Sequence, residues 1–208
     1  MEAKVLDTKG KATSDKIVLS ESIYGIEPND HAIYLDVKQY LANQRQGTHK
    51  AKERAEVSKS TRKIKKQKGT GGARAGSLKS PVFVGGGTIF GPRPRSYSFK
   101  LNTKLKRLAR KSALTYKVND ESLFILDGLK FDTPKTKEFK SILTALKLED
   151  VKVLFVVADA NDNAYKSAKN LTKAKVVSAD SLNTYDVLNA RKVIIAKEAV
   201  EVIEKILN

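Results

Sequence analysis

The sequence predicts an α/β fold: a three-layer domain with a mostly parallel central sheet, plus a long extended basic glycine-rich loop. Short β-branched runs alternate with helical patterns over the second half of the chain, which is the order of βαβ units. Several runs are almost continuously apolar, as VLFVV and VIIA are, and this is typical of parallel strands that helices cover on both faces. The loop is predicted because apolar periodicity disappears between Gly47 and Tyr97.

The first part of the chain contains two short apolar runs, around Val5 and at 17–19, and then one helix. The helix is expected from about Asn29 to Gln44, because Asn29 or Asp30 can cap its first turn and Gly47 is a natural stop. Its apolar residues fall on one face at helical spacing: Ile33, Val37, Tyr40 and Leu41.

A second helix is expected after the loop, where helical periodicity returns at Leu101. One of its faces should pack on the domain and the opposite face is cationic. The packing face carries Leu101, Leu105, Leu108, Ala109, Ser112 and Tyr116, and the cationic face carries Lys106, Arg107, Arg110 and Lys111.

The remainder of the chain alternates strand and helix patterns without an internal repeat. Strands are expected at Ser122–Asp127, Lys152–Asp159, Lys175–Asp180 and Lys192–Ala196. Helices are expected to start at Thr133 and Pro134, to span Asp162–Leu171 and Asn183–Asn189, and to end the chain with Val200, Ile203 and Leu207 on one face.

The sequence therefore predicts a single α/β domain over 1–208 with an inserted extended loop at 46–97, whose tip lies at about 58–78. Nine of the 12 glycines and three of the five prolines fall within this loop. Loops longer than about 15 residues are uncommon in compact domains and usually have a function, so the loop requires a partner.

The excess positive charge of the chain is confined to one block. Residues 44–117 hold 21 Lys and Arg against 2 Asp and Glu, whereas the rest of the chain holds 19 and 21, and no acid occurs from Val57 to Asn119. The block is either a solvated basic linker or an arm that binds phosphates. Clustered cations gain affinity for nucleic acid by releasing its condensed counterions, which favours the arm.

The glycines of the loop do not form a nucleotide-binding motif. A G-x-G-x-x-G fingerprint beginning at Gly85 fails at Phe90, and the spacing from Gly71 to Gly76 is followed by Ser77 where a phosphate-binding loop needs lysine. A nucleotide-binding enzyme is therefore only a remote alternative.

The chain offers no convincing catalytic or metal-binding group. It has no Cys, and its two histidines, His31 and His49, have no carboxylate partner evident from the sequence. Asp127, Asp159 and Asp180 come at the ends of expected strands, where catalytic carboxylates often lie in α/β enzymes. For Asp159 and Asp180 the simpler interpretation is that they are helix caps or turn residues. No cofactor, metal or small-molecule substrate is expected. The absence of an apolar run long enough for a signal or a membrane span predicts a cytoplasmic protein.

The composition of the block suits RNA in particular. Glycines let the backbone approach a phosphate or base edge closely, and aromatic rings either stack on unpaired bases or fix the loop to the domain. Lysine and arginine without a recognition helix favour phosphate and shape contacts over sequence readout. The aromatic residues concerned are Phe83, Phe90, Tyr97 and Phe99.

Several strings resemble the large-subunit ribosomal protein four family, and the resemblance covers nearly the whole chain. They are RQGT at Arg45, RAEV at Arg54, QKGTGGARAGSLKSP at Gln67, GGGTIFGPRPRSYSFKLN at Gly85, KRLARKSAL at Lys106, PKTK at Pro134 and TYDVLNARKVIIAKEAV at Thr184. The chain departs from relatives at Ile64–Lys66, Gly72 and Phe83–Val84.

The resemblance implies a structural protein of the large ribosomal subunit that binds its 23S-type rRNA, supports assembly and lines the nascent-peptide exit tunnel beside ribosomal protein twenty-two. Regulation of its own messenger RNA is the alternative. The expected rRNA-binding residues are Arg45, Lys50, Lys52, Arg54, Lys59, Arg62, Lys63, Lys65, Lys66, Lys68, Arg74, Lys79, Arg93, Arg95, Lys104, Arg107 and Lys111. Close backbone approach is expected at Gly69, Gly71, Gly72, Gly76, Gly85, Gly86 and Gly87, and the tunnel-facing tip carries Arg62, Lys63, Lys65, Lys66 and Arg74.

Overall fold

The computed structural model describes residues 2–129, 131, 133–158 and 162–208. The chain divides into two compact units. The first, here called the core domain, runs from Met1 to Leu41 and from Lys100 to Asn208, and the second, here called the arm, runs from Ala42 to Phe99.

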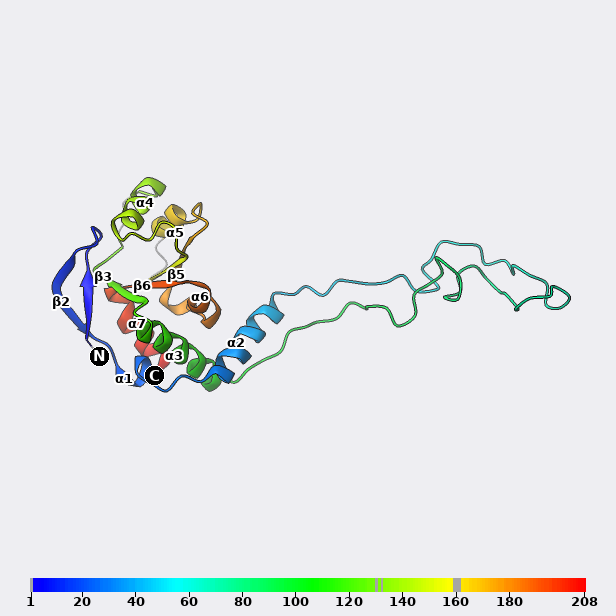
Figure 1. Cartoon of the computed structure of the whole chain (residues 1–208), viewed down its shortest axis with the longest axis horizontal. Helices are drawn as coiled ribbons and strands as arrows, with labels where there is room; N and C mark the ends of the chain where they lie inside the picture. The colour runs from blue at the N-terminus through cyan, green and yellow to red at the C-terminus, as the bar shows by residue number, and fades with distance from the viewer. Residues whose placement is uncertain (1, 130, 132, 159–161) are drawn as a thin grey trace. The chain divides into compact units, whose positions relative to one another are not determined.

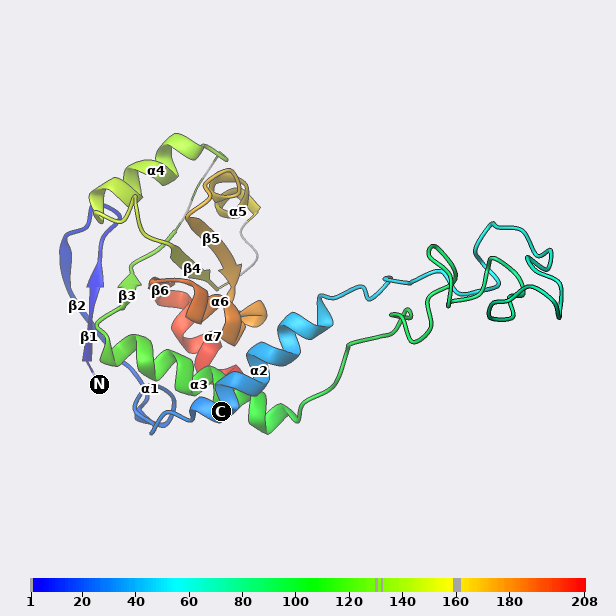
Figure 2. The ribbon, with the colours of Figure 1, turned by 45° about the vertical axis from the view of Figure 1, so that its right-hand side comes forward.

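The core domain is built on a six-stranded sheet in the order β2-β1-β3-β6-β4-β5 (Figure 1; Figure 2). Every neighbouring pair is parallel except β1 and β2, which are antiparallel. The predicted α/β class with a mostly parallel sheet is thus confirmed. The strands are β1 (Glu2–Leu6), β2 (Ala12–Val18), β3 (Leu123–Leu126), β4 (Val153–Val157), β5 (Ala174–Ser178) and β6 (Lys192–Ala196).

Helices cover both faces of this sheet, which makes the three predicted layers (Figure 1). On one face, Phe139 and Ala164 pack on Phe155 of β4 and Ile194 of β6. On the other face, Leu114 and Ile203 pack on the residues of β4 and β6 that point the opposite way. The first face is covered by α4 (Thr136–Ala145) and α5 (Asp162–Ala168), and the second by α1 (Glu21–Tyr24), α3 (Thr103–Asn119), α6 (Thr184–Asn189) and α7 (Lys197–Leu207).

The β1–β2 hairpin was not predicted from the sequence. Its turn runs from Asp7 to Lys11, where the Asp7 amide donates to the Lys11 carbonyl over 2.9 Å and Gly10 adopts a φ of 77°. The β2 sequence ATSDKIV places its two large apolar residues together at the end instead of alternating them, so periodicity gives no signal for an edge strand of this kind.

Helix α2 (Asp30–Asn43) forms where expected, but its fully buried residues are not the apolar ones that share the predicted face. Asn29 does cap it, since its Oδ1 accepts from the Ala32 amide over 2.9 Å. The buried residues are nevertheless Ala32, Asp36 and Gln39, and Leu41 is exposed. Asp36 can be buried because it accepts a hydrogen bond of 2.5 Å from the Thr184 hydroxyl of α6. This face of α2 therefore buries a polar group whose hydrogen bond is satisfied.

Other differences from prediction concern element ends. Helix α2 ends at Asn43, one residue before the expected end at Gln44. Helix α5 ends at Ala168, before the expected Leu171, and the Leu171 amide bonds back to the Ala168 carbonyl in a turn. The expected strand end and cap at Asp159 lie outside the described residues.

Candidate nucleic-acid interface

The arm consists of two chain segments that run side by side (Figure 1; Figure 2). Beyond Asn43, none of its residues, all of which the structure describes, belongs to a helix or strand. Backbone hydrogen bonds tie the two segments together at intervals. They run from Arg95 N to Gly47 O (3.1 Å), from Ala51 N to Pro92 O (3.1 Å), from Thr88 N to Lys52 O (2.9 Å) and from Ile64 N to Gly76 O (3.1 Å).

The arm has no hydrophobic core of its own. Of its residues, all of them described, only Ala75 and Gly87 are buried. Large apolar side chains instead face solvent, with Val84 100% exposed and Phe90 103% exposed. Burial of apolar surface is the main favourable term in folding, and it contributes little to the stability of the arm. Exposed apolar side chains of this kind are typical of a surface that a partner covers.

Both acids of the arm are neutralised within it. Arg93 Nη2 lies 2.8 Å from a carboxylate oxygen of Glu53, and Lys50 Nζ forms an ion pair with Glu56. The Lys50 ammonium holds the pKa of Glu56 below its ordinary value, and the same hydrogen bond raises the pKa of Lys50. The paired acids leave the remaining cations of the arm uncompensated.

Most of the other predicted cations have no acceptor of their own. Lys59 Nζ donates to the Val84 carbonyl over 3.0 Å and Lys63 Nζ to Gln67 Oε1 over 2.6 Å, while the charge of Lys52 helps to lower the pKa of Glu56. Apart from Lys52, seven predicted cations of the arm, all within its described residues, have no hydrogen bond, ion pair or ring contact: Arg54, Arg62, Lys65, Lys66, Lys68, Arg74 and Lys79.

Two of the predicted arginines share one tyrosine ring. The guanidinium carbons of Arg45 and Arg95 lie 3.9 and 4.6 Å from the centroid of the Tyr97 ring. The Tyr97 hydroxyl and His49 Nε2 are 3.1 Å apart, which gives His49 a phenol partner and no carboxylate. Sequence reasoning missed this cluster, because its members come from the two opposite segments of the arm.

Three of the predicted rRNA-binding cations lie on α3 in the core domain, and they differ in their hydrogen bonds. Lys104 is exposed, whereas Arg107 Nη1 donates to the Asn208 carbonyl and Lys111 Nζ to the Ser22 carbonyl, both over 3.2 Å. Two of these three cations therefore contribute hydrogen bonds to the domain itself.

The predicted glycines fall into two groups. A Cβ on Gly86 would overlap the Ser80 carbonyl oxygen of the same segment, so the local turn there requires glycine. A Cβ on Gly87 would overlap the Arg54 amide nitrogen of the opposite segment, so the pairing of the two segments requires this glycine. A Cβ on Gly85 or Gly72 would meet only a lysine ammonium, at 2.5 and 3.3 Å. Around Gly69, Gly71 and Gly76 a Cβ would meet nothing within 4 Å, which leaves that backbone open to a partner.

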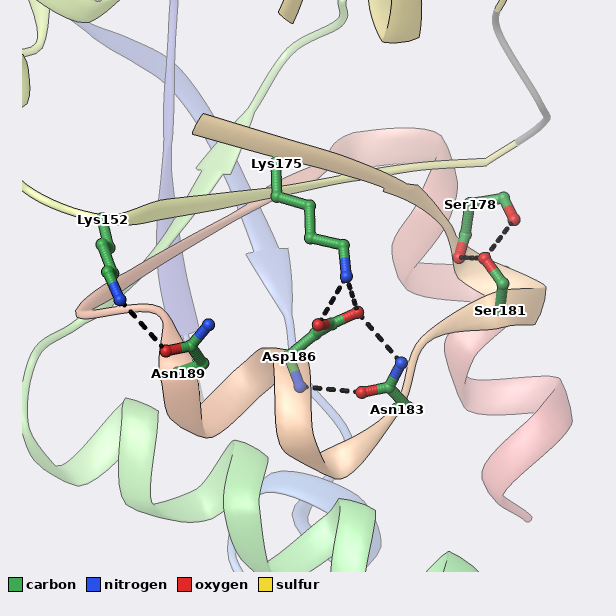
Figure 3. A network of polar contacts seen from close by, with 7 residues as sticks. All are labelled: Lys152, Lys175, Ser178, Ser181, Asn183, Asp186 and Asn189. Atoms are coloured by element: carbon green, nitrogen blue, oxygen red, sulfur yellow. Dashed lines mark hydrogen bonds and ion pairs between the residues drawn. The ribbon is translucent and has the colours of Figure 1, made fainter. Parts of the chain in front are cut away.

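The core domain contains a hollow of about 370 Å³ beside β5, and several of its polar groups are paired with one another (Figure 3). Lys175 Nζ lies 2.6 and 2.7 Å from the two carboxylate oxygens of Asp186, and Asn183 donates to Asp186 over 2.9 Å. The hydroxyls of Ser178 and Ser181 are 2.7 Å apart. These groups hold β5 and α6 together, and they include no nucleophile paired with a base.

The part of the chain that the structure describes contains neither a metal-binding cluster nor a membrane-spanning helix. No group of three His, Asp or Glu residues there could hold a metal ion. Among those same residues, no helix combines the length and the apolar character that a membrane crossing requires.

Comparison with known proteins decides the family. The sequence matches the Ribosomal protein L4/L1 family over residues 17–206, which includes the whole arm and nearly all of the core domain. The chain belongs to the ribosomal protein L4/L1 family. This is a family of ribosomal proteins and not of enzymes, so the interpretation of the chain as a non-enzyme is confirmed and the nucleotide-dependent enzyme is wrong.

Relatives in this family match the chain along its full length. A protein of Cytophaga hutchinsonii named large ribosomal subunit protein uL4 is 61% identical over 208 residues, which is 100% of both chains. Proteins of the same name from Christiangramia forsetii and Flavobacterium johnsoniae are 60% and 59% identical, again over 100% of both chains. Membership in the ribosomal protein L4/L1 family therefore extends to both units.

Proposed function

We propose that this chain is a structural constituent of the large ribosomal subunit in the cytoplasm, and that its arm binds the 23S-type rRNA of that subunit. Residues 46–97 form the rRNA-binding loop and support subunit assembly. The tip, at about 58–78, lines the nascent-peptide exit tunnel beside ribosomal protein twenty-two. The names of the full-length relatives support the large ribosomal subunit as the assembly in which this chain functions.

One observation carries the assignment of rRNA binding to the arm: its cations, except the half-buried Lys79, are exposed and mostly unpaired, while its two acids are paired internally. A polyanion is the partner that lowers the mutual repulsion of such cations, and each phosphate contact releases condensed counterions. Four of the five tip cations, namely Arg62, Lys65, Lys66 and Arg74, belong to the unpaired set.

The arm also fits rRNA by its backbone. The open surroundings of Gly69, Gly71 and Gly76 leave amide groups accessible to phosphates or base edges. In the core domain, Lys104 is the predicted cation most available to rRNA, because Arg107 and Lys111 also bond to backbone carbonyls of the domain. The proposal requires no cofactor, membrane or small-molecule substrate.

A charge-removal variant tests the role of the arm. Replacing Lys63, Lys65, Lys66 and Lys68 together by Ala should weaken binding to large-subunit rRNA and lower the slope of log affinity against log salt by about 3, since each lost phosphate contact removes about 0.7 to 0.9. The measurement is a filter-binding titration at several salt concentrations.

The matched control removes four exposed lysines of the core domain, Lys9, Lys11, Lys137 and Lys140, and so changes the net charge equally. Its slope should stay near that of the unsubstituted chain. If both quadruple variants lowered the slope alike, the binding would be a general charge effect and the arm assignment would be wrong. Crosslinking from the arm in cells that recovered messenger RNA and no rRNA would favour the regulatory alternative.

A further inference from the structure

The four aromatic residues of the arm differ in their exposure and in their contacts. The Tyr97 ring is occupied by two guanidinium groups, and Phe83 is half-buried. Phe99 is 37% exposed, and its amide donates to Asn43 Oδ1. Phe90 differs from all three, because its side chain is 103% exposed.

The backbone at Phe90 is unusual for a residue with a large side chain. Its φ is 58°, in the left-handed region that side chains other than Asn, Asp and Gly rarely adopt. Such a conformation persists only where the surrounding structure imposes it, and it occurs most often at functional sites.

The chain on both sides of Phe90 is fixed to the opposite segment of the arm. The Thr88 amide donates to the Lys52 carbonyl over 2.9 Å, and the Pro92 carbonyl accepts from the Ala51 amide over 3.1 Å. Between them, a Cβ on Gly91 would lie 2.6 Å from the Cβ of Ala51, so the two segments are in close contact there. The ring of Phe90 is therefore presented to solvent by a backbone that is held on either side.

We propose that Phe90 stacks on an unpaired base of the large-subunit rRNA. This inference rests on the proposed function, since it names a contact within the same interface. A planar apolar ring on a cationic arm fits a partner that offers both phosphates and apolar faces, and unpaired RNA bases offer both. A protein partner is less suited, because the acids that would attract its basic side chains, Glu53 and Glu56, are already paired.

Fluorescence gives a direct test, because the chain contains no Trp. Phe90→Trp introduces a single indole at the proposed contact, and Val84→Trp introduces one at an equally exposed arm position as the matched control. On titration of each full-length variant with large-subunit rRNA, stacking should quench the emission at position 90 far more than at position 84.

Affinity gives a second and independent readout. Phe90→Gly suits the positive φ and should leave the free arm intact, yet it should weaken rRNA binding by about 5- to 150-fold, the range found when a stacking aromatic is lost. Phe90→Tyr keeps the ring and should bind like the unsubstituted chain, as should Val84→Ala.

The outcomes separate this inference from the proposed function. If the unsubstituted chain bound large-subunit rRNA no better than an unrelated RNA, the proposed function would fail. If it bound well but Phe90→Gly and Phe90→Leu bound equally well, the stacking role would be overturned while the function stood. Equal quenching at positions 84 and 90 would also overturn it.

Discussion

At the scale of single residues, Tyr24 places a hydroxyl where nothing in the described part of the chain hydrogen-bonds to it. The residue is fully buried and belongs to the main hydrophobic cluster, and its hydroxyl is buried as well. Burial raises the pKa of Tyr24 well above its ordinary value, and the charge of Glu204 raises it further. A buried donor without a partner costs free energy, so this ring contributes to stability by its apolar surface alone.

Replacing Tyr24 by Phe should raise the free energy of unfolding by about 1 kcal/mol, because the desolvated hydroxyl is removed and the ring is kept. The pH dependence should change as well. The folded state holds the Tyr24 proton more tightly than the unfolded state does. The free energy of unfolding therefore falls as the pH rises above the unfolded pKa of about 10, and the Phe variant lacks this fall. Thermal denaturation at neutral and alkaline pH measures both effects.

Tyr116→Phe is the control, because the Tyr116 hydroxyl donates to Asp30 over 2.6 Å. This hydrogen bond, chiefly, raises the pKa of Tyr116. The control variant should lose stability slightly where Tyr24→Phe gains it. A loss of stability in Tyr24→Phe would show that its hydroxyl has a partner after all.

At the scale of elements, an ion pair joins β5 to α6. The Asp186 side chain is 3% exposed and the Lys175 side chain 55% exposed. Asp186 also receives the Asn183 amide, and its own backbone amide donates to Asn183 Oδ1 over 2.7 Å, which caps the helix. The carboxylate thus fixes the start of α6 against the edge strand of the sheet.

Lys175→Met should destabilise the core domain by about 1–2 kcal/mol, which lies between the small effect of an exposed pair and the larger effect of stranding a buried charge. Lys173→Met is the matched control, since Lys173 pairs with Asp150 over 2.9 Å and the Asp150 side chain is 97% exposed. Its effect should be under about 1 kcal/mol. Denaturant unfolding compares the two, and equal effects would deny the pair a structural role. The added change Asp186→Asn should restore part of the loss in Lys175→Met, because it removes the buried charge.

Some elements of the fold are predictable from the sequence and others are not. The buried strands β4 and β6 and their helices follow from apolar runs that need no knowledge of neighbours. The hairpin strand β2 and the buried face of α2 depend on partners distant in sequence, such as Thr184 for Asp36. Local periodicity cannot encode a polar pair of that kind, so the apolar residues of α2 do not identify its fully buried positions.

At the scale of the whole molecule, both hydrophobic clusters lie in the core domain, and the arm contributes to neither. A chain in which a short Gly-Ser linker replaces residues 44–98 should therefore fold. The linker has little to span, because the Phe99 amide donates to Asn43 Oδ1 over 3.3 Å.

The melting temperature of this shortened chain should stay within about 5 °C of the full chain, since changing loop length alters the closure entropy only by about 0.6 kcal/mol per doubling. Its affinity for large-subunit rRNA should be lost. Circular dichroism and filter binding measure these two quantities. A shortened chain that failed to fold would mean that the arm stabilises the core domain.

The candidate interface was predictable in its charge and not in its internal pairing. The acid-free run from Val57 to Asn119 is visible in the sequence and identifies the arm. The pairing of Glu53 with Arg93, 40 positions away, and the exposure of Phe90 depend on how the two segments of the arm align. The sequence therefore predicts where the cations are, and the structure shows which of them remain free.

The parallel pairing of β1 with β3 sets an order of events during synthesis. Val5 pairs with Ile125, so the first strand has no parallel neighbour until most of the chain has been made. By then all residues of the arm have already been translated. The cationic segment is thus complete before the sheet can close, so the rRNA binding proposed for the arm would be able to begin while the core domain is still assembling.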